Sequence, residues 1–332
     1  MPHTSNPVIS VVMTVFNSEK YLAQAINSIL TQTHLEFEFI IVNDGSTDRS
    51  LEILQQFAAR DKRIQLISRG NTGVAAALND GLACARGEYI GRMDSDDISL
   101  PTRLETQLAF MREHPECIAA SCRELTIDPE GWPIRILPCL LSHEEIDSFH
   151  LKGLGGGLSG PSAFIRRASI VAVGGYRAEY LLAEDYDLWL RLAEIGRLAN
   201  LPDLLFCYRE HASGLTHSRQ DQRRMLTWKA QKEAHERRQL SFSKPPPSPS
   251  GGMAIDLRER WAKLALAAGY YPTARKHAWR QFLHAPSLRL LRILMEATAR
   301  PVVEPLYDLV RGRMPRSWSG ARVVLPSGII RG

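Results

Sequence analysis

Short apolar runs alternate with segments of helical spacing through the first part of the chain. Residues 8–15 form a continuous apolar run rich in β-branched side chains, which is typical of a strand buried on both faces of a sheet. Apolar residues then recur at helical spacing over residues 21–30, with Ser18 as the predicted N-cap. The same alternation predicts strands at 37–42, 64–67 and 89–93 and helices at 48–59 and 72–85. Strands that alternate with helices of about a dozen residues build βαβ units, so we predict an α/β fold with a doubly wound, mostly parallel central sheet and flanking helices.

A polar cluster follows each of these predicted strands. The clusters are Thr14, Phe16 and Asn17 after the first strand, residues 43–48 after the second, Arg69 and Asn71 after the third, and residues 94–97 after the fourth. In doubly wound sheets the loops at the carboxyl ends of the strands gather at one edge and bind ligands there. We therefore expect these four loops to form one binding site.

The most informative loop is Asp94-Ser95-Asp96-Asp97. Carboxylates a few ångströms apart raise one another's pKa and destabilise the fold unless a cation lies between them. Oxygen ligands of this kind suit Mg²⁺ or Mn²⁺, which keep other coordination positions for phosphate oxygens and water. Some of these residues have an alternative role as helix N-caps ahead of Pro101. The cluster predicts a divalent-metal site.

Charge divides the 332 residues into two parts. Up to Ser218 the sequence has 19 Lys and Arg and 28 Asp and Glu, a balance of −9 (19 − 28). From Arg219 onward the counts are 22 and 8, a balance of +14 (22 − 8). We therefore expect the two parts to interact with different partners. The length of the chain suffices for one large α/β domain plus a smaller appendage.

Cysteine usage and hydropathy exclude several classes of protein. The five cysteines are scattered, with no C-x-x-C pair and no paired His spacing typical of zinc, which favours a reduced, cytosolic compartment. Residues 1–6 show no basic segment followed by an apolar one, and no stretch approaches the roughly 18 apolar residues of a membrane span. We expect neither secretion through a signal peptide nor a membrane-spanning helix.

Beyond residue 100 the pattern becomes less regular. A helix is predicted over 101–114 and a strand over 118–122, and another apolar run lies at 163–165. Glycines concentrate in residues 153–160, where they favour a mobile loop or a close backbone approach. An amphipathic helix is predicted to begin at Glu184 and Asp185, with one side formed by Leu188, Trp189, Leu192 and Ile195.

Three motifs, taken in order, resemble those of family 2 glycosyltransferases of the GT-A fold. They are Asn43-Asp44-Gly45-Ser46-Thr47-Asp48, Asp94-Ser95-Asp96-Asp97 and Glu184-Asp185, and the resemblance covers roughly residues 8–218. It implies an inverting, metal-dependent enzyme of the hexosyltransferase type that uses Mn²⁺ or Mg²⁺. The donor implied is a nucleotide-sugar, foremost a UDP-sugar, and the acceptor a saccharide or a lipid-linked group in cell-envelope or exopolysaccharide synthesis.

The resemblance also implies roles for individual residues. Asp96, Asp97 and His211 are expected to hold the metal. Asp185 is expected to act as the general base, with Glu184 orienting the acceptor or the neighbouring loop. The residues expected to bind the nucleotide-sugar are Thr14, Phe16, Asn17, Asp44, Arg69, Asn71, Asp94 and Ser95, and among these Asp44 resembles the acid that accepts the imide N–H of uracil.

Structural roles stay open for the same residues. Residues 43–48 are also typical of a turn that ends in a helix N-cap, with Ser46 or Asp48 capping the next helix. Arg69 is equally typical of a solvated surface cation, and a lone histidine such as His211 is more often structural. Glu184 and Asp185 would also complement a helix dipole.

The sequence after the core domain predicts a basic helical region. The predicted domains are a GT-A-like catalytic domain at 1–218, a basic helix at 219–242, a Pro/Ser/Gly linker at 243–252 and basic helices at 253–332. No nucleic-acid-binding signature is present, so no nucleic acid is expected as a partner. Arginines interleaved with apolar residues are typical of helices on an anionic membrane surface, and packing on the catalytic domain or on a protein is the alternative.

These patterns predict a cytoplasmic enzyme, with peripheral attachment to the inner face of the cell membrane as an open possibility. Two other functions stay open. One is a polyprenyl-phosphate glycosyltransferase, and the other is a non-catalytic nucleotide-sugar-binding protein that acts through its helical tail.

Overall fold

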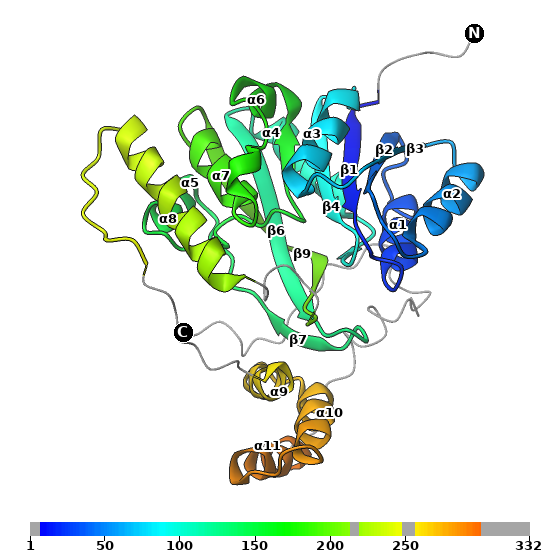
Figure 1. Cartoon of the computed structure of the whole chain (residues 1–332), viewed down its shortest axis with the longest axis vertical. Helices are drawn as coiled ribbons and strands as arrows, with labels where there is room; N and C mark the ends of the chain where they lie inside the picture. The colour runs from blue at the N-terminus through cyan, green and yellow to red at the C-terminus, as the bar shows by residue number, and fades with distance from the viewer. Residues whose placement is uncertain (1–6, 213–218, 248–255, 300–332) are drawn as a thin grey trace. The chain divides into compact units, whose positions relative to one another are not determined.

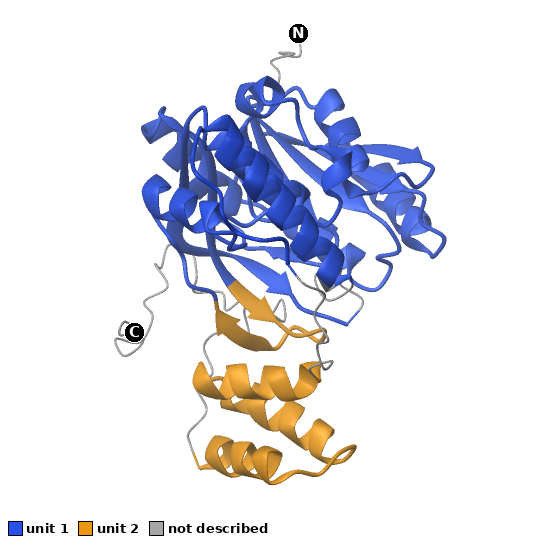
Figure 2. Cartoon of the chain, turned by 60° about the vertical axis from the view of Figure 1, so that its left-hand side comes forward, with its two compact units in different colours: residues 1–124, 137–253 blue, residues 125–136, 254–332 orange. Residues whose placement is uncertain are grey.

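The computed structural model describes residues 7–212, 219–247 and 256–299 (Figure 1). The N-terminal residues 1–6, the predicted end of the core domain at 213–218, the linker residues 248–252 and the predicted basic region at 300–332 lie outside the described residues. The described residues form two compact units (Figure 2). The first holds residues up to 124 and from 137 to 247, and the second holds residues 125–136 and the helices after 256.

In the described part of the chain, nine strands form a single sheet in the order β3-β2-β1-β4-β8-β6-β9-β5, with β7 paired to β6. Strands β3, β2, β1 and β4 run parallel, and β8 joins β4 in antiparallel register. The strands are β1 (Ile9–Val15), β2 (Phe37–Asp44), β3 (Ile64–Arg69), β4 (Tyr89–Asp94), β5 (Ile98–Ser99), β6 (Cys117–Ile127), β7 (Pro133–Ile136), β8 (Phe164–Arg166) and β9 (Arg197–Arg209).

Helices cover both faces of the sheet, because alternate residues of the buried strands face opposite layers. In β1, Val11 and Met13 pack with one group of helices, while Val12 packs with the other. The first group is α1 (Leu22–Leu30), α2 (Ser50–Arg60) and α4 (Arg103–Glu113). The second group is α3 (Val74–Cys84), α5 (His143–Leu151), α6 (Arg167–Ala172) and α7 (Glu184–Leu192). The predicted doubly wound α/β fold is confirmed.

The predicted strands and helices of the first unit are present, with ends displaced by a few residues, and two details of the prediction are wrong. Ser18 is not the N-cap of α1, because the helix begins four residues later and the Ser18 hydroxyl lies 2.7 Å from the hydroxyl of Ser95 instead. Ile195 is not on the apolar side of α7, because it lies beyond the end of the helix and is exposed. Helix α8 (Gln220–Arg237) lies within the segment 219–242, for which the sequence predicts a basic helix, and it packs against α7.

The second unit combines the β6–β7 hairpin with three helices, α9 (Leu257–Ala267), α10 (Tyr271–Phe282) and α11 (Leu288–Thr298). Its core is small and rich in alanine, with Ala262, Ala265, Ala274 and Ala278 buried beside Leu290 and Ile293. A buried carboxylate, Asp128 of the hairpin, pairs with Lys276 and lies 2.7 Å from the ring Nε2 of His277. Among the described residues, no helix combines the length and apolar character needed to cross a bilayer.

Candidate active site

Three aspartates gather where β4 ends. Oxygens of Asp94, Asp96 and Asp97 all lie within 4.8 Å of one another. Burial, together with the neighbouring carboxylates, raises the pKa of Asp94 to about 6 and that of Asp97 well above its usual range. A cation bound among them would relieve the resulting free-energy cost. The structure brings the predicted cluster together.

The oxygens of this cluster fit a hard divalent cation. One oxygen of Asp97, Oδ1, accepts a hydrogen bond from the backbone N–H of Arg209 at 2.7 Å. The other, Oδ2, is buried and has no hydrogen-bond partner among the described residues. A buried carboxylate oxygen without a partner is costly, and a metal ion would satisfy it.

His211 reaches the cluster from the chain that follows β9. Its Nε2 lies 2.8 Å from Oδ2 of Asp96, and its ring packs at 5.2 Å from the ring of Tyr21. Arg209 supports the same corner, because its Nε donates to the backbone carbonyl of Asp96 at 2.7 Å. The predicted set of Asp96, Asp97 and His211 is therefore assembled in one place.

Asp185 faces this cluster across a single buried guanidinium. Arg92 of β4 donates through Nη2 to Oδ1 of Asp94 at 3.0 Å and pairs through Nη1 with Asp185. The Arg92 side chain is only 4% exposed, so the two carboxylates share a cation that is shielded from solvent. Because Arg92 contacts both carboxylates, it links Asp94, Asp96 and Asp97, which we call the metal-type cluster, to the first turn of α7.

Gly160 of the glycine-rich segment 153–160 lies against the pair formed by Arg92 and Asp185. A Cβ on Gly160 would lie 1.9 Å from Oδ2 of Asp185 and 2.5 Å from Nη1 of Arg92. A side chain at residue 160 would therefore displace Asp185 or Arg92 from the positions that they hold here. Glu184, beside Asp185, is buried, and burial with the Asp185 charge raises its pKa to about 7. Its Oε2 has no hydrogen-bond partner within the described chain.

The predicted nucleotide loops also meet at this edge. Asp44 at the end of β2 accepts backbone N–H groups from Thr72 at 3.1 Å and Gly73 at 2.9 Å, and Arg69 lies 3.4 Å from it. Gly45 has a φ of +73° and a Cβ there would lie 2.6 Å from the backbone N of Asn71, so the two loops touch. Asp44 therefore has a structural role in holding the loop after β3.

Three other predicted residues border the same edge. Asn17 has a positive φ, and its Oδ1 accepts the backbone N–H of Thr47 at 2.8 Å, so it orders the loop after β2. Phe16 beside it is half exposed. Thr14 lies opposite Asp94 in the β1–β4 register, close to the carboxylates. Asp48 accepts the N–H of Ser50 at 2.9 Å beside the start of α2, but the N-cap position of that helix is Arg49, and neither Ser46 nor Asp48 caps it.

Sequence reasoning missed two important residues, Arg92 and Gly160. A signal for Arg92 exists, because an arginine inside a buried strand needs a counter-charge, but the sequence does not show which carboxylates face it. Gly160 is one of several glycines in its segment, and only its distance to Asp185 distinguishes it.

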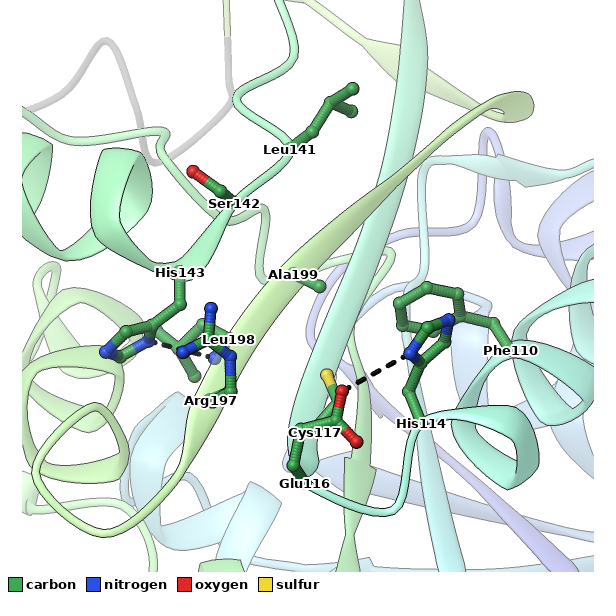
Figure 3. Close-up of a pocket in the computed structure, with 10 residues that line it drawn as sticks. All are labelled: Phe110, His114, Glu116, Cys117, Leu141, Ser142, His143, Arg197, Leu198 and Ala199. Carbon is green, nitrogen blue, oxygen red and sulfur yellow. Dashed lines mark hydrogen bonds and ion pairs between the residues drawn. The ribbon is translucent and has the colours of Figure 1, made fainter.

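A separate cavity of about 160 Å³ lies away from these acids (Figure 3). Its lining includes His114, Cys117, His143 and Arg197. Strands β4 and β6 run in the same direction, because both are antiparallel to β8, and Cys117 begins β6 whereas Asp94 ends β4. The cavity therefore lies at the opposite edge of the sheet from the acidic cluster.

Comparison with known sequences identifies related proteins. The family model described as Glycosyl transferase family 2 matches residues 10–173. The putative glycosyltransferase EpsE of Bacillus subtilis is 37% identical over 212 residues, which cover 62% of this chain and 74% of that protein. The amylovoran biosynthesis glycosyltransferase AmsE of Erwinia amylovora is 32% identical over 203 residues, or 60% of this chain and 74% of that protein.

Two solved structures share the fold. The structure of S. aureus TarS 1-349 in complex with UDP-GlcNAc has a TM-score of 0.55 at 18% identity and covers 88% of this chain and 90% of that one. The mannosyltransferase PcManGT of Pyrobaculum calidifontis, in complex with GDP-Man and Mn²⁺, has a TM-score of 0.53 at 19% identity and covers 93% and 85%. At such identities the likeness shows the fold, and it confirms the predicted GT-A-type architecture.

Proposed function

Because this chain belongs to glycosyl transferase family 2, we propose that it is an inverting, metal-dependent enzyme that transfers a sugar from a UDP-sugar to a saccharide or lipid-linked acceptor. One observation carries the proposal. The metal-type cluster and the candidate base lie at one sheet edge, joined through Arg92, which contacts both Asp94 and Asp185. Transfer from a nucleotide-sugar requires one group for the leaving diphosphate and another for the acceptor hydroxyl, and this edge supplies both.

On the donor side, Asp94, Asp96, Asp97 and His211 would hold Mn²⁺ or Mg²⁺. When bound, the cation supplies charge neutralisation for the diphosphate that leaves. Arg209 keeps Asp97 in place through its backbone N–H and keeps the loop at Asp96 in place through its guanidinium. These contacts preorganise the carboxylates, so little reorganisation is needed when the donor binds.

On the acceptor side, Asp185 would take the proton of the acceptor hydroxyl while that oxygen forms its bond to the anomeric carbon. The bond from the anomeric carbon to the diphosphate oxygen breaks on the opposite face, which inverts the configuration. No general acid is needed, because the diphosphate is a good leaving group. Asp185 lies in the first turn of α7, where an acidic side chain complements the helix macrodipole.

Glu184 has a different part in this proposal. Burial raises its pKa towards neutral pH, so its protonated form can donate a hydrogen bond to the acceptor and its charged form can accept one. Its buried Oε2, which has no partner in the described structure, is free for this contact.

For the nucleotide, we propose that Asp44 accepts the imide N–H of uracil with a lone pair that the loop contacts leave unused. The half-exposed Phe16 offers an apolar face beside it. A polysaccharide or its lipid-linked precursor is the proposed acceptor, in keeping with the relative named for amylovoran biosynthesis.

Donor hydrolysis tests this function directly. The full chain is incubated with Mn²⁺ and a panel of nucleotide-sugars, and the release of nucleoside diphosphate is measured with and without saccharide and lipid-linked acceptors. Turnover of a UDP-sugar that stops with chelator supports the proposal. Tight UDP binding without turnover of any donor would instead identify a non-catalytic nucleotide-sugar-binding protein.

A further inference from the structure

Five large apolar side chains lie exposed on two neighbouring helices of the second unit. They are Trp279 and Leu283 at the end of α10 and Leu288, Leu291 and Met295 of α11, with exposed fractions from 42% for Leu291 to 87% for Leu288. The two helices pack against each other (Figure 1). We call these five residues the outer patch. Exposed apolar groups collected in this way mark an interaction surface.

Helix α11 is apolar on two opposite sides. Leu290, Ile293 and Ala297 are spaced by three and four residues and are buried in the core of the unit. Leu288, Leu291 and Met295 have the same spacing, begin two residues earlier, and point the other way. A surface helix needs one apolar stripe to pack, so the second stripe is not explained by the folding of this unit.

The charges beside the outer patch are positive. Residues 271–298 contain five Lys and Arg and one carboxylate, Glu296, and two of these cations, Lys276 and Arg280, pair with Asp128 and Glu130 of the hairpin. Arg289 and Arg292 flank the outer stripe, and their side chains are 70% and 82% exposed. They pair with Glu259 and Glu296, but ion pairs this exposed contribute little free energy and exchange readily for another anion.

From this arrangement we propose that the outer patch docks the second unit onto an anionic lipid surface. Leucine and methionine side chains would enter the boundary between headgroups and acyl chains, and Trp279 would lie at the headgroup level, where its ring is favoured. Arg289 and Arg292 have long apolar stems that can lie along the acyl boundary while the guanidinium meets lipid phosphate. The excess of positive charge selects a lipid surface over an apolar protein groove, because anionic headgroups complement it.

The test measures lipid binding and needs no turnover, so it is independent of the proposed function. The full chain is sedimented with vesicles of phosphatidylcholine alone or with about 30% phosphatidylglycerol, a composition chosen to give a strongly negative surface potential. A triple variant, Leu283→Ser, Leu288→Ser and Met295→Ser, should reduce partitioning onto the anionic vesicles by at least about 100-fold, since each inserted side chain contributes roughly fivefold to tenfold. The double variant Arg289→Gln and Arg292→Gln should lose about 25-fold on anionic vesicles and almost nothing on neutral ones.

A matched control removes three exposed apolar side chains from the first unit, through Leu35→Ser, Val171→Ser and Ile195→Ser. It should bind vesicles as the wild type does. Equal binding by the outer-patch variant and the wild type would overturn the proposal. So would a wild-type dimer, seen by sedimentation velocity without lipid, that the outer-patch variant dissociates, because the patch would then join two copies of the chain.

Discussion

Substitution of Gly160 by alanine should impair the chemical step without weakening nucleotide binding. The new Cβ would lie 1.9 Å from Oδ2 of Asp185, whereas ordinary contact begins near 3.4 Å. The Asp185 carboxylate, or the backbone beneath Gly160, must therefore move by about 1.5 Å (3.4 − 1.9). A catalytic group misplaced by about 1 Å can cost about 100-fold in rate. We expect kcat for donor turnover to fall about 100-fold and UDP affinity to change much less, because the new Cβ meets Asp185 and Arg92, whereas the proposed uracil contacts are Asp44 and Phe16.

The same glycine-rich segment supplies the control. A Cβ on Gly155 would have its nearest neighbour, Nη2 of Arg223, at 3.9 Å, and neither Gly155 nor Gly160 has a positive φ. Gly155→Ala should therefore keep wild-type turnover. Initial rates of nucleoside diphosphate release give kcat and KM, and calorimetry gives UDP affinity. The reasoning is refuted if Gly160→Ala turns over normally, or if both variants lose activity equally.

Two further predictions concern buried charges. Arg92→Gln removes the cation between Asp94 and Asp185 and should lower the free energy of unfolding by about 3 kcal/mol at pH 8, as breaking a buried ion pair does. Without Arg92 the pKa of Asp94 rises further above 6, so its protonation should shrink this deficit as the pH falls from 8 towards 6, below which Asp94 is protonated in both proteins. Urea denaturation at pH 5 and pH 8 measures the deficit, and an equal deficit at both values contradicts the assignment. In the second unit, burial opposes ionisation of Asp128, but hydrogen bonds from His277 and Lys276 prevail and lower its pKa to about 2. Asp128→Asn should therefore lower the free energy of unfolding at pH 7 by about 2.5 kcal/mol, which is the linkage value of this pKa shift. The difference from wild type should vanish as the pH falls from about 4 to 2, and a difference that persists at pH 2 would show that the shape of the side chain, not its charge, is responsible.

Features that recur with a short period could be predicted from the sequence. The alternation of β-branched runs with helices located strands β1 to β4, and the polar loops after them meet because parallel strands place their carboxyl ends at one edge. Asp94, Asp96 and Asp97 were found because like charges in a row require a cation, a requirement that depends on local sequence alone.

Other features depend on contacts between distant residues and were not predictable. Arg92 and Asp185 are 93 positions apart, and only the folded chain shows that one pairs with the other. The hairpin that ends β6 belongs with helices that begin more than a hundred residues later, through the pairing of Asp128 with Lys276. Ser18 looked like a helix cap because its own neighbourhood allows that role, but its hydroxyl is hydrogen-bonded to Ser95 instead.

The central claim is that two groups of carboxylates divide the work, with Asp96 serving the diphosphate through the metal and Asp185 serving the acceptor proton. Calorimetry of UDP binding with and without Mn²⁺, paired with turnover, tests it on Asp96→Asn and Asp185→Asn. We predict that Asp96→Asn abolishes the enhancement of UDP affinity by Mn²⁺ together with turnover. Asp185→Asn should keep that enhancement and lose turnover alone. Loss of Mn²⁺-dependent UDP binding in Asp185→Asn, or normal turnover by either variant, would contradict this account.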